Sequence, residues 1–321
     1  MHILKQRYAL VSIIFSLSCL LLLAIHLGSS SLERVLEHCQ NVSPFQLAWL
    51  WALMSSAAVY LLRTLRLKLM VQKCSLSNSF YICATHNVLT RLLPFRSGEF
   101  SLPFMLNKRE DIPVLEGTLL MLWLRLVEVA TLVPFIAFCA LLNPALIDYL
   151  PFEQAYLWTG IAGLSLCISL WIKPILKGLI TVLCLIFTRL KKDKFVIKLS
   201  QVQDIGHNIS QRKALLAISM TFLILFGQAS LFYWILCACG SHLHYLNVAL
   251  ASVLVHLAGV IPAPTMGNVG THEIAWLVIF KTLGLNESIA LSSAVLSQWL
   301  TLLFAVAWWG LAKTFSYLSI D

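Results

Sequence analysis

Charged residues are scarce in this chain of 321 residues. Asp, Glu, Lys and Arg together make up only 12% of it, whereas hydrophobic residues make up 59%. Soluble domains carry about a quarter charged residues, so the composition excludes a soluble globular enzyme and a disordered chain. The net charge of +9 does not indicate nucleic-acid binding, because the basic residues lie between long apolar runs, as they do in membrane proteins. We therefore expect an all-α, polytopic membrane protein.

Motifs for nucleotides, acyl transfer and metals are also missing. The chain contains no Walker A motif, no G-x-S-x-G and no C-x-x-C pair. The dipeptide His272-Glu273 begins a zinc-type H-E-x-x-H motif, but Trp276 stands where the second histidine would be. We therefore expect no metal, no cofactor and no ATP hydrolysis by this chain.

Six uninterrupted apolar segments predict membrane spans, since about 20 apolar residues cross the hydrocarbon core. Only the third contains charged residues. The first is too long for a signal peptide and no typical cleavage site follows it, so we expect it to be retained. The predicted spans are 8–28, 44–62, 114–142, 155–172, 214–238 and 288–312.

Two further apolar segments, 77–106 and 247–284, are interrupted by proline and glycine. Proline removes a backbone donor and glycine loosens a helix, so both segments are predicted to be broken helices. Because irregular backbone is not tolerated in lipid, each break should lie inside the protein or face a watery cavity. The break residues are Pro94 and Gly98 in the first segment and Pro262, Pro264, Gly267 and Gly270 in the second.

The distribution of basic residues predicts an orientation. If both broken segments are re-entrant hairpins, then the two termini and the loops 63–76, 107–113 and 173–213 share one side of the membrane. Those segments and their flanks hold 18 of the 23 Lys and Arg residues. Cytoplasmic loops are enriched in Lys and Arg, so we expect both termini to be cytoplasmic.

This topology contains a symmetry within a single transmembrane domain, 1–321. Each half reads span, span, hairpin, span, and three crossings invert the second half relative to the first. Interrupted segments at matching places in inverted halves are typical of transport proteins. The predicted repeats are 1–142 and 155–312, and 173–213 forms a basic cytoplasmic linker. Eight or more ordinary spans are the alternative.

Charges in or beside the apolar segments are the candidate functional groups. A lone charge at the bilayer centre costs about 2.5–3.5 kcal/mol on insertion scales, so each one needs a partner, water or a ligand. Arginine binds phosphate through two parallel hydrogen bonds. Arg91 and Arg96, which flank the first break, therefore suit a phosphate. The alternative is that they contact lipid phosphates at the interface. The six candidates are Arg91, Arg96, Glu99, Arg125, Glu128 and Glu273.

The other four candidates form two pairs. Arg125 and Glu128 lie three residues apart and share a helix face, which fits either an internal ion pair or the wall of a site. Glu99 and Glu273 are the matching acids of the two breaks. Each could hold a cationic group, carry a proton or cap a helix N-terminus.

Both breaks together resemble the lysylphosphatidylglycerol synthetase transmembrane-region family. These are flippase-like integral membrane proteins, and they include the N-terminal domain of the multiple peptide resistance factor. Met266 and Asn268 stand where the family often has proline and glycine. The resemblance rests on Asn87, Leu93, Pro94, Arg96, Gly98 and Glu99, on Arg125 and Glu128, and on Pro262, Pro264, Gly267, Gly270 and Glu273.

The resemblance implies a bacterial inner-membrane protein that moves a phosphate-bearing lipid between leaflets. In this mechanism Arg96 contacts the lipid phosphate, supported by Arg91 or Arg125, while Glu99 and Glu273 hold the rest of the head group or a proton. The family's soluble synthase domain is not in this sequence, so we expect no aminoacylation of lipids. The expected partners are the lipid and a lipid-synthesis enzyme. The alternatives are a membrane-embedded enzyme or a scaffold in the synthesis of lipids or lipid-linked glycans, and a small-solute transporter.

Overall fold

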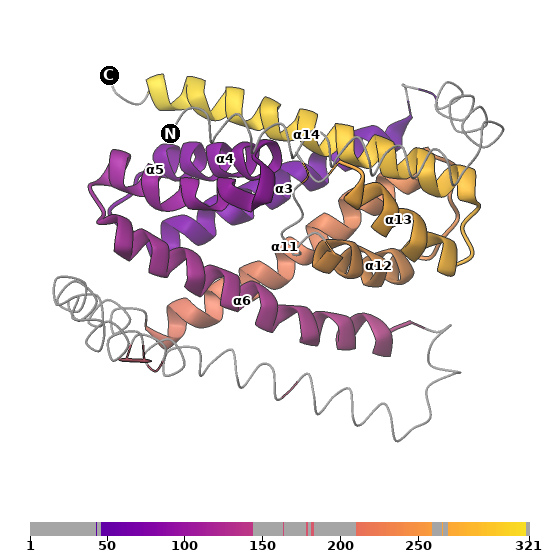
Figure 1. The fold of residues 1–321 in the computed structure, drawn as a ribbon, viewed down its shortest axis with the longest axis horizontal. Helices are drawn as coiled ribbons and strands as arrows, with labels where there is room; N and C mark the ends of the chain where they lie inside the picture. The colour runs from indigo at the N-terminus through magenta and orange to yellow at the C-terminus, as the bar shows by residue number, and fades with distance from the viewer. Residues whose placement is uncertain are drawn as a thin grey trace. The chain divides into compact units, whose positions relative to one another are not determined.

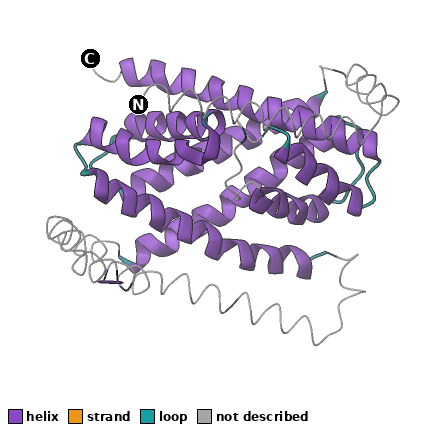
Figure 2. Ribbon diagram, in the orientation of Figure 1, coloured by secondary structure: helices purple, strands orange, loops and turns teal. Residues whose placement is uncertain are grey.

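Helices make up all the secondary structure in the residues that the computed structural model describes (Figure 2). Those residues are 43, 46–143, 163, 178, 181–182, 210–258, 265 and 269–318, without the side chains of 94–96 and 318. The following predicted features lie outside the described residues: the spans 8–28 and 155–172, most of the linker 173–213, the residues Pro262, Pro264, Met266, Gly267 and Asn268, and the side chains of Pro94 and Arg96.

Four of the predicted spans are confirmed as long apolar helices (Figure 1). Each is long and apolar enough to cross a membrane, although the count of six spans and the inverted repeat stay predictions. Leucine and alanine dominate these helices, and both are strong helix formers. The four are α3 (Leu47–Met70), α6 (Val114–Leu141), α11 (Gln211–Ala238) and α14 (Glu287–Leu318).

Helix α3 is longer than its predicted span. The span was expected to end at residue 62, with 63–76 on the cytoplasmic side, but the helix continues to Met70. The helix therefore ends later than the predicted span. Leu, Arg, Lys and Met fill most of this stretch, and all four favour helix. The hydropathy falls where these charged residues begin, but the backbone stays helical.

Both interrupted segments are broken helices, as predicted. In the first, α4 (Leu76–Leu92) is followed by a short 3-10 helix, η1 (Pro94–Phe100), and by α5 (Ser101–Glu110). In the second, α12 (Tyr245–Ala258) and α13 (Thr271–Thr282) flank the break. The first break lies at Pro94 to Gly98, and α13 begins directly after Gly270, so at these places the local backbone chemistry coincides with the ends of helices.

The halves of the first broken segment fold back on each other. Asn78 Nδ2, near the start of α4, donates to Glu110 Oε1 at the end of α5, over 2.9 Å. The guanidinium of Arg109 lies 4.5 Å from the centre of the Tyr81 ring. Residues from the beginning of the segment thus contact residues from its end, which makes α4 and α5 a helical hairpin. Whether this hairpin is re-entrant in a membrane stays a prediction.

The chain divides into two compact units, which are described separately here. The helices α3, α4 and α11 contribute residues to both. The first unit consists of Met1–Tyr60, Ala84–Ser101 and Leu225–Asp321, and the second of Leu61–Cys83 and Leu102–Ile224.

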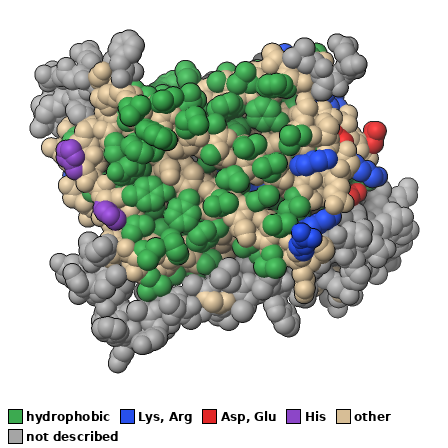
Figure 3. All heavy atoms as spheres, turned by 180° about the vertical axis from the view of Figure 1, so that it is seen from behind, with side chains coloured by type: hydrophobic (Ala, Val, Ile, Leu, Met, Phe, Trp, Pro, Cys, Tyr) green, Lys and Arg blue, Asp and Glu red, His purple; other side chains and the backbone are tan. Residues whose placement is uncertain are grey.

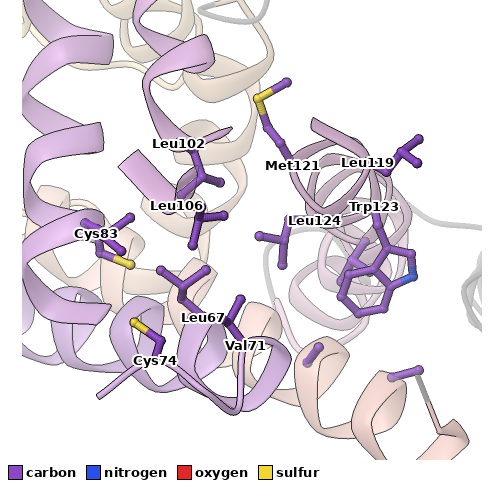
Figure 4. Packing of buried hydrophobic residues seen from close by; sticks show 14 of the residues in the cluster. Leu67, Val71, Cys74, Cys83, Leu102, Leu106, Leu119, Met121, Trp123 and Leu124 are labelled. Carbon is purple, nitrogen blue, oxygen red and sulfur yellow. The ribbon is translucent and has the colours of Figure 1, made fainter. Parts of the chain in front are cut away.

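In the second unit, a core of buried hydrophobic residues joins α3, α5, α6 and the start of α11. Figure 4 shows the side chains of Leu67, Leu106 and Leu124 directed into the same space. Gly117 permits a close approach of α6 to α5, because a Cβ atom there would lie 2.9 Å from Pro103 Cα. The core therefore packs the second half of the first hairpin against a spanning helix.

In the first unit, α12, α13 and α14 pack side by side (Figure 1). Trp276 is fully buried between them and packs edge-on against Phe232 of α11, with ring centres 4.8 Å apart. Val248 near the start of α12 and Phe280 near the end of α13 belong to the same core. The second broken segment thus also folds back on itself, against α14.

Large hydrophobic side chains are abundant on the surface of the described residues. Figure 3 shows them over much of the visible surface. Leu223 of α11 and Leu303 of α14 are 52% and 62% exposed. Soluble monomers rarely expose contiguous apolar areas of this kind, so this surface suits contact with lipid.

The break in the first segment depends on Gly98. A Cβ atom at this buried position would lie 2.2 Å from the Leu89 carbonyl oxygen and 2.5 Å from the Thr90 nitrogen. Both clashes involve backbone, which cannot rotate away. We expect Gly98→Ala to reduce the free energy of unfolding by about 1–3 kcal/mol, as overpacked cores do. Thermal unfolding of the purified protein in detergent measures the loss.

A matched control is Gly310→Ala in α14, where a Cβ atom would meet nothing within 4 Å. Alanine favours helix over glycine, so this variant should be at least as stable as the wild type. Equal unfolding midpoints for the two variants would contradict the close packing at Gly98.

Candidate functional site

Three buried hydroxyl residues line one face of α14. Ser293 and Ser297 are fully buried, and Thr301 is 7% exposed. They are spaced by four residues, so they form a stripe along the helix with steps of about 6 Å. Each hydroxyl donates to a carbonyl of its own helix three residues earlier, over 2.8–3.1 Å. Their protons are therefore in use, and their lone pairs face outward as acceptors.

Helix α13 supplies donors to two of these hydroxyls. The Trp276 Nε1–H donates to Ser293 Oγ over 3.0 Å, and His272 Nε2 lies 3.0 Å from Ser297 Oγ. Because the Ser297 proton goes to the Ala294 carbonyl, the imidazole must be the donor, with its proton on Nε2. Trp276, which replaces the second histidine of a zinc motif, thus has a role of its own in packing α13 on α14.

The third hydroxyl binds a charged group from the first broken segment. Arg91, in the last turn of α4, donates through Nη1 to Thr301 Oγ1 over 3.0 Å. The charge of Arg91 also acts on the His272 ring. Both broken segments therefore place polar side chains on one stripe of α14. We name this set of six residues the α14 seam: Arg91, His272, Trp276, Ser293, Ser297 and Thr301.

Glu273 caps the N-terminus of α13. Its side chain is almost fully buried, and its Oε2 accepts the N–H of Gly270 over 2.6 Å. Gly270 has a φ of +86°, which residues with a Cβ atom rarely adopt. Of the roles considered for Glu273, capping is therefore the one that its contacts display. The matching acid Glu99 lies partly buried on η1.

A second polar group lies in the second unit, where two arginines hold one carboxylate. Arg66 Nη2 lies 2.7 Å from Glu128 Oε1, and Arg125 Nη1 lies 2.7 Å from Glu128 Oε2. The side chain of Arg66 is 7% exposed, that of Glu128 24% and that of Arg125 36%. The predicted contact between Arg125 and Glu128 is thus a direct ion pair, and Arg66 extends it to a triad.

Thr221 of α11 binds the Arg66 side chain of this triad. Its Oγ1 accepts from Arg66 Nη1 over 2.9 Å and donates to the Ala217 carbonyl over 2.7 Å. The contacts join α3, α6 and α11 through side chains that are costly to bury alone. We name the four residues Arg66, Arg125, Glu128 and Thr221 the arginine cluster.

A comparison with protein families matches residues 9–308 to the lysylphosphatidylglycerol synthase TM region. The chain belongs to this family. The match includes both broken segments, the arginine cluster and the α14 seam, and it gives the chain a lipid-related role in a membrane. No curated protein and no solved structure matches the chain.

Within this family member, five contact residues were missed by sequence reasoning. Arg66 was not considered, because the hydropathy falls at residue 63 and the predicted span ends at residue 62. Thr221, Ser293, Ser297 and Thr301 gave no signal, because a serine or threonine that bonds to its own helix is common in spans. The four-residue spacing of the three on α14 was the available clue. The predicted phosphate ligand Arg96 has its side chain outside the described residues, so its contacts stay a prediction.

The seam can be tested at Thr301. Thr301→Val keeps the shape of the side chain but removes the acceptor of Arg91, which leaves a donor of that guanidinium without its partner. We expect a loss of about 1–3 kcal/mol in the free energy of unfolding. Chemical or thermal unfolding in detergent gives the value.

The same substitution at Thr314 is the control, because Thr314 is exposed on the same helix. Exposed replacements usually change stability by less than about 0.5 kcal/mol. If Thr301→Val is as mild as Thr314→Val, the hydrogen bond from Arg91 does not stabilise the first unit.

Proposed function

We propose that the protein moves a phosphate-bearing lipid between the two leaflets of its membrane. The observation that carries this proposal is the α14 seam. Two broken helical segments, both rare in membranes unless they line a cavity, place their polar side chains on one stripe of an apolar helix. A lipid head group needs such a polar route through the hydrocarbon core, while its acyl chains stay in the bilayer.

The chemistry of the seam suits an anionic head group at Arg91. The guanidinium is partly buried, and the partner that the structure gives it is the neutral hydroxyl of Thr301. A phosphate would offer that guanidinium two charged acceptors in a bidentate geometry, which is the stronger interaction. Exchange of the hydroxyl for the phosphate is therefore favourable once a head group arrives.

The bonds within the seam are also weak enough to rearrange. Each joins a donor to a neutral hydroxyl, and such bonds contribute about 0.5–1.5 kcal/mol for the neutral donors and about 1.5–3 kcal/mol for the charged donor Arg91. A lipid can therefore displace them one at a time. Arg96 and Glu99 belong to the same broken segment as Arg91, and in this proposal they contact the remainder of the head group. Movement of one broken segment against α14 would expose the head group to each leaflet in turn.

Arg91→Gln tests the proposal. The protein is reconstituted into vesicles that contain phosphatidylglycerol with a fluorescent NBD label on its head group, and dithionite reduces the label in the outer leaflet. In the presence of wild-type protein, label from the inner leaflet becomes accessible. We expect Arg91→Gln to slow this exposure at least about tenfold, since a charge-assisted contact to phosphate is lost.

Lys313→Gln is the control, because Lys313 is an exposed cation of α14 that lies beside Trp309. It should transport at the wild-type rate. Unfolding midpoints must be compared for all three proteins, so that a slow variant is known to be folded. A folded Arg91→Gln variant with wild-type transport would refute the proposal.

A further inference from the structure

Arg125 lies on an apolar face of α6 that is open to its surroundings. Leu122, Leu126 and Val129 are 38%, 37% and 57% exposed. Leu122 and Val129 are neighbours of Arg125 on the helix surface at i−3 and i+4, and Leu126 follows it in sequence, so the three lie on the same side of it. The Arg125 side chain is itself 36% exposed. A cation thus stands within the part of a spanning helix that faces lipid.

The position of this cation along the helix is unusual. Arg125 is the twelfth residue of the 28 in α6, about 16 Å from the start of the helix at 1.5 Å per residue. A cationic side chain at a helix end reaches the membrane interface by snorkelling over a shorter distance than this. Inserting a cation at this depth of a membrane costs free energy, and charged residues at such positions are usually functional.

The charges around Glu128 sum to a positive value. Arg66 and Arg125 contact its two oxygens, and the charge of Arg63 also acts on it. Two guanidinium groups thus contact one carboxylate, and the charge of a third acts on it. The carboxylate compensates one of these charges, and the immediate surroundings keep an excess of positive charge that favours an anion.

The two arginines bind different oxygens of Glu128, and Arg66 is held by a further contact, with Thr221. Arg66 is bound through Oε1 and is also held by Thr221. Arg125 is bound through the other oxygen, Oε2. Arg125 can therefore leave Glu128 without disturbing Arg66, and Glu128 does not become an unpaired carboxylate when it does so.

We propose that Arg125 binds the phosphate of an anionic lipid that approaches α6 from the hydrocarbon side. The phosphate takes Arg125 from Glu128, while the acyl chains lie against Leu122, Leu126 and Val129. Arg66 keeps Glu128 neutralised. The apolar surroundings of Arg125 favour a lipid over a soluble anion, because a soluble anion would have to cross a hydrophobic surface to reach the site. The inference rests on the proposed function in one respect: a head group reaches this depth only while it crosses the membrane.

Lipid binding to the purified protein tests the site. Native mass spectrometry in a neutral detergent compares the retention of dioctanoyl phosphatidylglycerol with that of dioctanoyl phosphatidylcholine. We expect the wild type to prefer phosphatidylglycerol. Arg125→Gln should weaken phosphatidylglycerol binding about tenfold, and Arg125→Lys less, because lysine keeps the charge but loses the fork. Lys313→Gln should bind as the wild type does.

Glu128→Gln separates a binding site from a purely structural ion pair. This variant removes the carboxylate that competes for Arg125, so we expect phosphatidylglycerol to bind several-fold more tightly even though the protein becomes less stable. A structural pair alone predicts lower stability with no gain in binding. Weaker binding in Glu128→Gln, or wild-type binding in a folded Arg125→Gln variant, would overturn the proposal.

Competition with a soluble anion identifies the source of the phosphate. Inorganic phosphate at the concentration of the lipid should not displace phosphatidylglycerol, and displacement would refute the lipid assignment. This assay reports binding in detergent, where no leaflets exist. Its failure would leave the vesicle result for Arg91 intact, and a failure of transport would leave the binding result intact.

Discussion

Every hydrogen-bonding group that enters the hydrocarbon core must find its partner within the protein. Unbroken helices meet this requirement through their own backbone. The two broken segments do not, and the structure supplies partners at the places where they need them. Glu273 accepts a backbone N–H at the start of α13, and α14 offers its hydroxyls to Trp276, His272 and Arg91. The polar side chains that flank the two breaks therefore find their acceptors on α14, and Glu273 satisfies a backbone donor at the start of α13.

The α14 seam and the arginine cluster meet the same requirement by different physical means. The α14 seam joins donors to neutral acceptors, and the charge among its members is the guanidinium of Arg91. The arginine cluster joins full charges, of which Arg66 is the most deeply buried. Breaking a buried ion pair by removing one partner costs several kcal/mol. The seam is suited to rearrangement, whereas the contact of Arg66 with Glu128 and Thr221 is suited to holding three helices together.

Much of the fold could be predicted because segments that cross a lipid bilayer must be predominantly apolar. Long apolar runs identified α6, despite its few charges, and α11 to within a few residues, and proline and glycine identified both breaks. The contacts of the site were less accessible. Arg66 was missed because hydropathy marks where the apolar residues end, whereas the helix continues beyond that point. The pairing of Thr301 with Arg91 joins residues 210 positions apart, and no local pattern encodes such a distance. The pair of Arg125 and Glu128 was visible because it lies within one helix.

The four-residue repeat of the α14 hydroxyls has a consequence for motion. The donors of α13, at 272 and 276, have the same spacing as the acceptors at 293, 297 and 301, and they run in the opposite direction. If α13 slid along α14 by one helical turn, Trp276 would meet Ser297 and His272 would meet Thr301. Both donors would keep a partner of the same kind, and Thr301 would pass from Arg91 to His272. The spacing of these hydrogen-bonding groups thus matches two registers, which differ in whether the guanidinium of Arg91 is bound to Thr301.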